Sequence, residues 1–107
     1  MENFTEQIHN LINFADYQDN SVVSKTIIKG NAGTFTYFAF DKGQSLSEHT
    51  TPFDAIVHII DGKAEIKISG NPYHLSAGDM LIMPANKPHS LFATEKFKML
   101  LTMFKSE

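Results

Sequence analysis

Two histidines in turn-rich stretches of the chain have the side chains best suited to bind a metal or a small molecule. His49 lies in the stretch GQSLSEHTTPFD, and His89 ends the stretch PANKPH. Imidazole nitrogens bind transition metals, so both residues are candidate metal ligands for a divalent ion such as Fe, Mn, Ni, Cu or Zn. A metal-free alternative stays open, in which both rings line a pocket and contact a small molecule.

The composition, the net charge and the absence of several motifs exclude other kinds of functional site. The chain has no cysteine, which excludes disulfides, thiolate metal sites and a cysteine nucleophile. It contains no glycine-rich phosphate loop, no G-x-S-x-G turn and no H-E-x-x-H helix. The formal net charge of −3 gives no electrostatic basis for binding nucleic acid. We expect no membrane contact and a cytoplasmic location, because no apolar run approaches roughly 20 residues and the polar N-terminus is unlike a signal peptide.

The two histidines must be positioned by strands, because the chain from Ser21 onward has β patterning. Runs of β-branched and aromatic residues alternate with turn residues at roughly 8–12-residue spacing, the pattern of an all-β sandwich or barrel. No helical pattern intervenes, which excludes parallel βαβ units. Asp61-Gly62 is expected to be a turn. The expected strands include Val22–Ile28, Thr34–Phe40, Lys63–Ser69, Tyr73–Leu75, Met80–Met83, Ser90–Thr94 and Phe97–Phe104.

The N-terminal stretch has a different pattern. Apolar residues at positions 4, 8, 11 and 12 share one face of a helix. Asn3, with Glu6 three residues later, is typical of a helix-capping box. The 107 residues suit one domain. We therefore expect a short N-terminal helix and turn over residues 1–20 and a single β-barrel domain over residues 21–107.

Two spaced motifs resemble the signatures of the cupin family. They are Gly43-x5-His49-x-Thr51-x3-Ala55-x6-Gly62 and Gly78-x5-Pro84-x-Asn86-x2-His89-x3-Ala93. The resemblance implies a jelly roll, or double-stranded β-helix, in which three histidines and a glutamate converge on a metal. His49 and His89 match two of those histidines, whereas Thr51 replaces the third and Ala55 replaces the glutamate. Asn86 replaces a motif glycine, which is a mild change because asparagine tolerates a left-handed backbone.

The resemblance leaves the third metal ligand open. A catalytic site usually has three protein ligands and one open position. Thr51 shares a strand face with His49 but offers only a neutral hydroxyl, and the methyl group of Ala55 cannot coordinate a metal. Alternation puts His58 on the face opposite Ala55, so it reaches the interior only if the strand is bulged. Thr51 and His58 remain candidates for a further ligand, and the expected pocket-lining residues are Ala55, Met83 and Phe53.

Two functions follow from these observations. The first is a small enzyme, dioxygenase-like or isomerase-like, in which a metal held by His49 and His89 assists a reaction of a small molecule in the barrel. The second is a non-catalytic module that binds or senses a small ligand, as cupin domains of bacterial transcription regulators do. In either case we expect a homodimer, because a small jelly roll has open sheet edges that must be covered.

Overall fold

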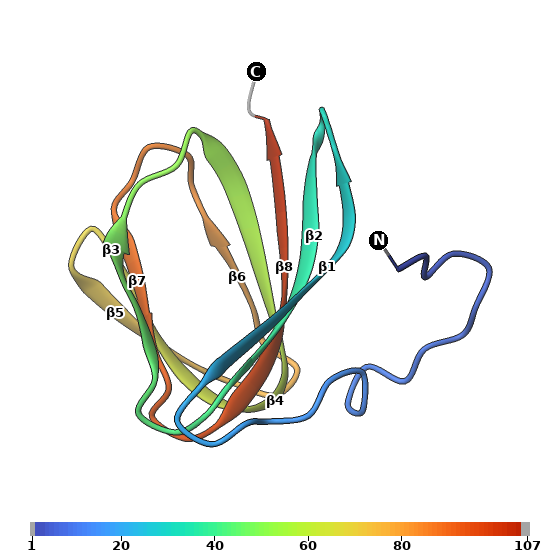
Figure 1. The fold of residues 1–107 in the computed structure, drawn as a ribbon. Coiled ribbons are helices and arrows are strands. Elements are labelled where there is room, and N and C mark those ends of the chain that lie inside the picture. Colours follow the sequence, from blue (N-terminus) through green and yellow to red (C-terminus); the bar gives the residue numbers. More distant parts are fainter. Residues whose placement is uncertain (1, 106–107) are drawn as a thin grey trace.

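The computed structural model describes residues 2–105, and these residues contain eight strands and no helix (Figure 1). No helix within this described range could cross a membrane. The strands are β1 (Val22–Gly30), β2 (Gly33–Phe40), β3 (Ser45–His49), β4 (Phe53–Ile68), β5 (Asn71–Ser76), β6 (Met80–Met83), β7 (His89–Phe92) and β8 (Phe97–Lys105).

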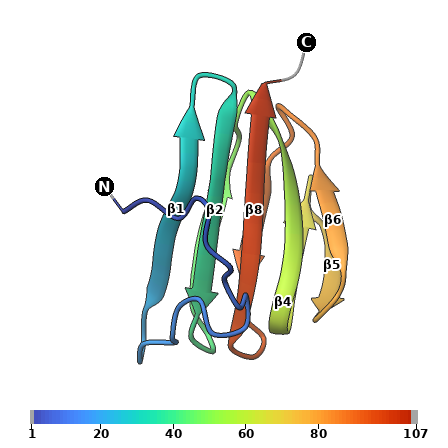
Figure 2. The ribbon, with the colours of Figure 1, turned by 90° about the vertical axis from the view of Figure 1, so that its right-hand side faces the viewer.

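The long strand β4 joins two antiparallel sheets. Its first part pairs with β8 and β6 and belongs to a sheet in the order β1-β2-β8-β4-β6. Its second part pairs with β7 and β5, and β7 pairs with β3. Figure 2 looks onto the first sheet, and Figure 1 shows the second sheet facing it. The two curled sheets form the all-β jelly roll, or double-stranded β-helix, that the resemblance implies.

Gly62 lets β4 pass from one sheet to the other. Its φ is +80°, a left-handed conformation that favours glycine. A Cβ there would lie 1.8 Å from the backbone oxygen of Lys96, which crosses closely above it. The pairing with β8 also shifts register between Ile59 and Asp61. The expected Asp61-Gly62 turn is therefore wrong: these residues form a bulged bend inside one continuous strand.

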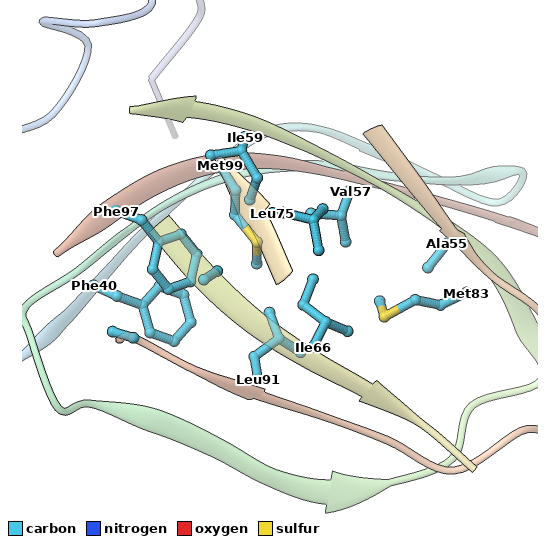
Figure 3. Close-up of a cluster of buried hydrophobic side chains, with 12 residues drawn as sticks. Phe40, Ala55, Val57, Ile59, Ile66, Leu75, Met83, Leu91, Phe97 and Met99 are labelled. Atoms are coloured by element: carbon cyan, nitrogen blue, oxygen red, sulfur yellow. The ribbon is translucent and has the colours of Figure 1, made fainter. Parts of the chain in front are cut away.

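The main core lies between the two sheets. Phe40 and Phe97 pair across β2 and β8 and stack their rings, with centroids 4.4 Å apart and planes 13° apart. Both are fully buried. Figure 3 shows them at one end of the cluster, whereas Ala55 and Met83 lie together at the other. The stacked rings close their end of the barrel.

The predicted N-terminal helix is wrong. The residues from 2 to 20 form turns and irregular chain, and Glu6 has a φ of +57°, which no right-handed helix contains. The Asn3 side chain accepts a hydrogen bond from the Thr5 backbone N at 3.0 Å, the local bond that competes with helix formation. Ile8, expected on the buried stripe, is fully exposed.

Tertiary contacts hold this segment against the outer face of the first sheet instead. The Tyr37 hydroxyl donates to the Leu11 carbonyl, and the Lys98 ammonium donates to the Ile12 carbonyl at 2.5 Å. Burial, assisted by the negative charge of Asp61, raises the pKa of Tyr37 to about 12, so its hydroxyl remains a donor at neutral pH. The Phe14 ring packs on Tyr37 at 5.1 Å between centroids. These bonds use carbonyl groups that a helix would have kept for itself.

Candidate functional site

The antiparallel pairing of β3 with β7 brings the two candidate histidines together. His49 is the cross-strand partner of His89, after a register shift that follows Leu46. The ring centroids are 4.3 Å apart, and the ring planes meet at 65°. Two residues separated by 40 positions in the sequence thus form one pair of imidazoles on the second sheet.

Both rings are oriented in the same way by backbone carbonyl groups. The Nδ1 of His49 lies 2.8 Å from the Ser47 oxygen, and the Nδ1 of His89 lies 3.2 Å from the Lys87 oxygen. A carbonyl oxygen can only accept, so each Nδ1 carries the hydrogen and donates it. In the neutral rings the lone pair is therefore on Nε2, where it can accept a hydrogen bond or bind a metal.

The two rings differ in exposure. His49 is exposed, whereas His89 is only 5% exposed. Burial lowers the pKa of His89; the Lys87 carbonyl opposes that shift, and the nearby His49 ring adds to it. His89 is therefore held in its neutral form, with His49 beside it at the solvent boundary.

Thr51 uses its hydroxyl locally. Its Oγ1 donates to the Phe53 carbonyl at 3.2 Å and accepts from the Phe53 backbone N at 3.3 Å. The Thr51 carbonyl accepts from the Asn86 backbone N at 2.8 Å, tying the loop before β7 to the start of β4. Asn86 has a φ of +65°, the left-handed conformation that its place in the motif predicts.

The position of the family's glutamate is apolar here. Ala55 pairs with Met83 of β6 on one side and with Met103 of β8 on the other. Ala55 and Met83 are each 2% exposed, and Met103 packs against the same core cluster. Two methionines are therefore the cross-strand neighbours of the alanine that stands where the motif has a carboxylate.

His58 lies away from the histidine pair. It is exposed on the outer face of the first sheet, as strand alternation predicts. It borders a shallow groove of about 300 Å³. The other residues lining this outer groove are Phe35, Ile56, Gly78, Met80, Leu100 and Thr102.

A pocket of about 260 Å³ opens beside the hairpin between β1 and β2. Phe53 and Met103 contribute apolar surface to it, and the buried hydroxyl of Thr34 has no hydrogen-bond partner. Its remaining lining residues are Lys29, Gly30, Asn31 and Gly33. Phe53 was predicted to line a pocket, whereas Thr34 and Met103 were missed. Alternation along β2 and β8 could have suggested that both face inward.

The donor set does not fit a tightly held hard divalent ion. Within residues 2–105 no group of three or more His, Cys, Asp or Glu side chains is placed to hold a metal. The histidine pair supplies two neutral donors, and the Thr51 hydroxyl is already bonded to backbone. A site of the usual kind needs a third ligand.

Comparisons with known proteins place the chain in a family. A sequence model of the Cupin domain matches residues 36–104, so the chain belongs to the cupin family.

The conserved SPY1581 protein of unknown function from Streptococcus pyogenes is 35% identical, with a TM-score of 0.91 over 95% of this chain and 90% of that one. A cupin 2 conserved barrel domain protein from Leptotrichia buccalis is 37% identical, with a TM-score of 0.88 over 91% of this chain and 47% of that one. A cupin superfamily protein from Desulfitobacterium hafniense, DSY2733, is 27% identical, with a TM-score of 0.89 over 94% and 93%. None of the curated proteins matches the chain.

Proposed function

We propose that this cupin binds a small organic molecule in its barrel, with His49 and His89 as the paired polar contacts. The observation that supports the proposal is the orientation of the two rings. They lie 4.3 Å apart, and both direct Nδ1 to a backbone carbonyl, which leaves both Nε2 lone pairs for a ligand. The neighbouring wall is apolar, as ligand pockets usually are, with few polar groups to set orientation.

The chemistry of the pair indicates the kind of ligand. Two neutral Nε2 atoms accept hydrogen bonds, so the ligand should present two neighbouring donors, such as the hydroxyl groups of a diol. Ala55, Met83 and Phe53 would contact its apolar part. Removing a buried acceptor leaves the ligand's donor unpaired, which costs about 1–3 kcal/mol.

A thermal-shift experiment tests this proposal in buffer containing EDTA. The probes are catechol, glycerate and malate, and the variants are His89→Leu and, as a matched control on exposed β5, His74→Leu. We expect at least one probe to raise the Tm of the wild type and of the control but not of His89→Leu. Stabilisation that is equal in all three proteins, or absent from all, would contradict the proposal.

Metal-assisted catalysis is the alternative that the family resemblance implies. It requires donors beyond the histidine pair, and the test is metal quantification in untagged protein from rich medium. Stoichiometric Fe, Mn, Ni, Cu or Zn that disappears in His49→Ala or His89→Ala would favour the enzyme. A metal content that does not change with either substitution would favour the binding module.

We also infer that a second copy of the chain covers the exposed edge of the first sheet. β1 ends that sheet, and an unpaired edge strand invites association. Ile28, on β1 itself, is a large apolar side chain exposed at this edge. Light scattering at tens of micromolar should give the mass of a homodimer, and a monomer would contradict the inference.

A further inference from the structure

We propose that the pocket beside the β1–β2 hairpin is a second binding site, one that takes a small carboxylate with an apolar tail. The lining residues come from the hairpin, from the start of β4 and from the end of β8. The strands β3 and β7, which contain the histidine pair, contribute none of them. Phe53 is the only side chain in common with the contacts proposed for the barrel ligand, so the site does not rest on the proposed function.

The hairpin is held firmly against β8, so the pocket is a preformed cavity. Gly33 pairs with Phe104, and a Cβ on Gly33 would collide with the backbone oxygen of Met103. The backbone N of Lys105 donates to the Ala32 carbonyl at 3.2 Å and ties the turn of the hairpin to the end of β8. The pocket volume of about 260 Å³ lies just below the usual range of ligand pockets, which favours a small molecule.

Thr34 contributes a polar group that the fold does not use. Within the described residues 2–105, its hydroxyl is the one buried side-chain polar atom without a hydrogen-bond partner. Thr34 pairs with Lys29 on one side and with Met103 on the other, and all three line the pocket. Directly paired residues point to the same face of a sheet, so the three side chains lie together there. An unpaired buried group calls for an explanation, and a bound ligand would provide one.

A ligand can reach this hydroxyl without disturbing the fold. The Thr34 side chain as a whole is only partly buried. Rotation about χ1 moves the side chain between staggered positions, so the hydroxyl can take the place of the methyl group. The rotation breaks no hydrogen bond, because the hydroxyl has none. Thr34 can therefore donate its hydroxyl proton to an acceptor in the pocket, and such a bond is strongest when the acceptor is charged.

The charges around the pocket favour an anion. Lys29 is the only ionisable residue among those that line it, and Lys105 is the cross-strand partner of Phe53 at its rim. In the part of the chain that the structure describes, neither lysine takes part in an ion pair. The carboxylate of Asp54, which follows Phe53, is directed away, since it accepts a hydrogen bond at 2.9 Å from a backbone N in the loop after β6. Two cations without an adjacent anion attract a negatively charged group.

The rest of the lining defines the tail of the ligand. Phe53 and Met103 form an apolar wall, and the amide of Asn31 at the turn can donate a further hydrogen bond. A short carboxylate such as hexanoate would accept from Thr34 and lie near Lys29, while its chain covers the apolar wall. Inorganic phosphate would leave that wall uncovered, and a neutral amide of the same length would not use the lysine charge.

Calorimetric titration with hexanoate, hexanamide and inorganic phosphate tests the site. We expect the wild type to bind hexanoate at millimolar concentration and more tightly than the other two probes. Thr34→Val should weaken hexanoate binding at least about ten-fold, because it removes a hydrogen bond to a charged group. Lys29→Gln should weaken it only about two- to five-fold, and less at high salt, because the ammonium is exposed. Thr36→Val on the same strand and Lys67→Gln, exposed on β4, are matched controls that should bind as the wild type does.

A measurement on the wild type alone covers the case in which Thr34→Val does not fold. With ¹³C-labelled methionine methyl groups, hexanoate should shift the NMR signal of Met103, which lines the pocket, and not that of Met80 on the exposed outer face. A Met103 signal that stays in place overturns the proposal. So does equal hexanoate affinity in Thr34→Val and the wild type, equal affinity for hexanamide and hexanoate, or no binding of hexanoate by the wild type.

His89→Leu separates this site from the proposed function. The variant should bind hexanoate as the wild type does, even though it loses the barrel ligand. If hexanoate binding is instead lost in His89→Leu and kept in Thr34→Val, the carboxylate binds at the histidine pair. That result overturns the second site and leaves the proposed function standing.

Discussion

The two ends of the barrel interior contain different kinds of side chain. At one end Phe40 and Phe97 stack at 4.4 Å and are fully buried. At the other end lie a small alanine, two flexible methionines and a pair of histidines, one of them exposed. Stacked aromatic rings are rigid, whereas the flexible methionine side chain fills irregular gaps and can adapt to a bound molecule. The difference supports our proposal that a small molecule binds at the end opposite the stacked rings.

Strand packing and hydrogen bonding show the same division. At the aromatic end, Gly62 lets two strands approach so closely that a Cβ would lie 1.8 Å from the Lys96 oxygen. At the other end the Thr34 hydroxyl is buried without a partner, beside a pocket. The packing therefore differs along the barrel. Strands approach closely at the aromatic end, whereas a pocket and an unpaired hydroxyl lie at the other end. Unpaired buried groups of this kind are uncommon in folded proteins.

Phe97→Ala should have the largest effect. Removing this fully buried ring, and with it the stacking contact to Phe40, should lower the free energy of unfolding by about 3–5 kcal/mol, measured by urea denaturation. Met83→Leu is the comparison at the opposite end and should cost less than about 1.5 kcal/mol. Equal losses in the two variants would abolish the distinction between the ends.

Ala55→Glu should convert the adaptable end into a site for a hard ion. Without metal, a buried carboxyl beside Met83 and Met103 should lower the free energy of unfolding by about 1–3 kcal/mol. Added Mn²⁺ or Zn²⁺ should restore the Tm, because the anionic ligand of the family motif is then present together with His49 and His89. Ala55→Gln has a similar size without the charge and should show the loss without the rescue. Rescue of both variants would mean that the charge is not what the site lacks.

Acid should weaken the histidine end selectively. Burial lowers the pKa of His89 in the folded protein. Below the ordinary histidine pKa near 6.5, His89 therefore becomes protonated in the unfolded chain while it stays neutral in the folded chain. Stability of the metal-free protein should therefore fall as the pH drops below about 6.5. Urea denaturation in EDTA between pH 7.5 and 5.5 measures the slope, which should be smaller in His89→Asn. An unchanged slope in that variant would assign the acid sensitivity to other groups.

The sequence predicts much of this arrangement and fails where tertiary contacts decide. Alternation and turn residues predict the strands, and the motif spacing predicts the jelly roll. The N-terminal helix fails because Tyr37 and Lys98, far away in sequence, bind the carbonyls of Leu11 and Ile12. Propensity and periodicity are local signals, and such long-range bonds override them.

The candidate site is predictable only in part for a related reason. Motif spacing identifies His49 and His89 as candidates, and alternation places His58 outside. The proximity of Met103 to Ala55 depends on the register between β4 and β8, which no local pattern reveals. The partnerless hydroxyl of Thr34 is likewise visible only after β2 has its neighbours.

Thr34→Val should have the smallest effect on stability and the most informative effect on binding. The Thr34 hydroxyl has no partner to lose, so replacing it with a methyl group should leave the free energy of unfolding unchanged or raise it by up to about 1 kcal/mol. If that hydroxyl instead contacts a small molecule that enters beside Phe53 and Met103, the organic probes should bind Thr34→Val more weakly than the wild type. Thr36→Val, on the same face of β2, is the control for adding a methyl group to this strand. A clear loss of stability in Thr34→Val would mean that its hydroxyl already has a partner, and the unpaired polar group would then no longer distinguish the two ends.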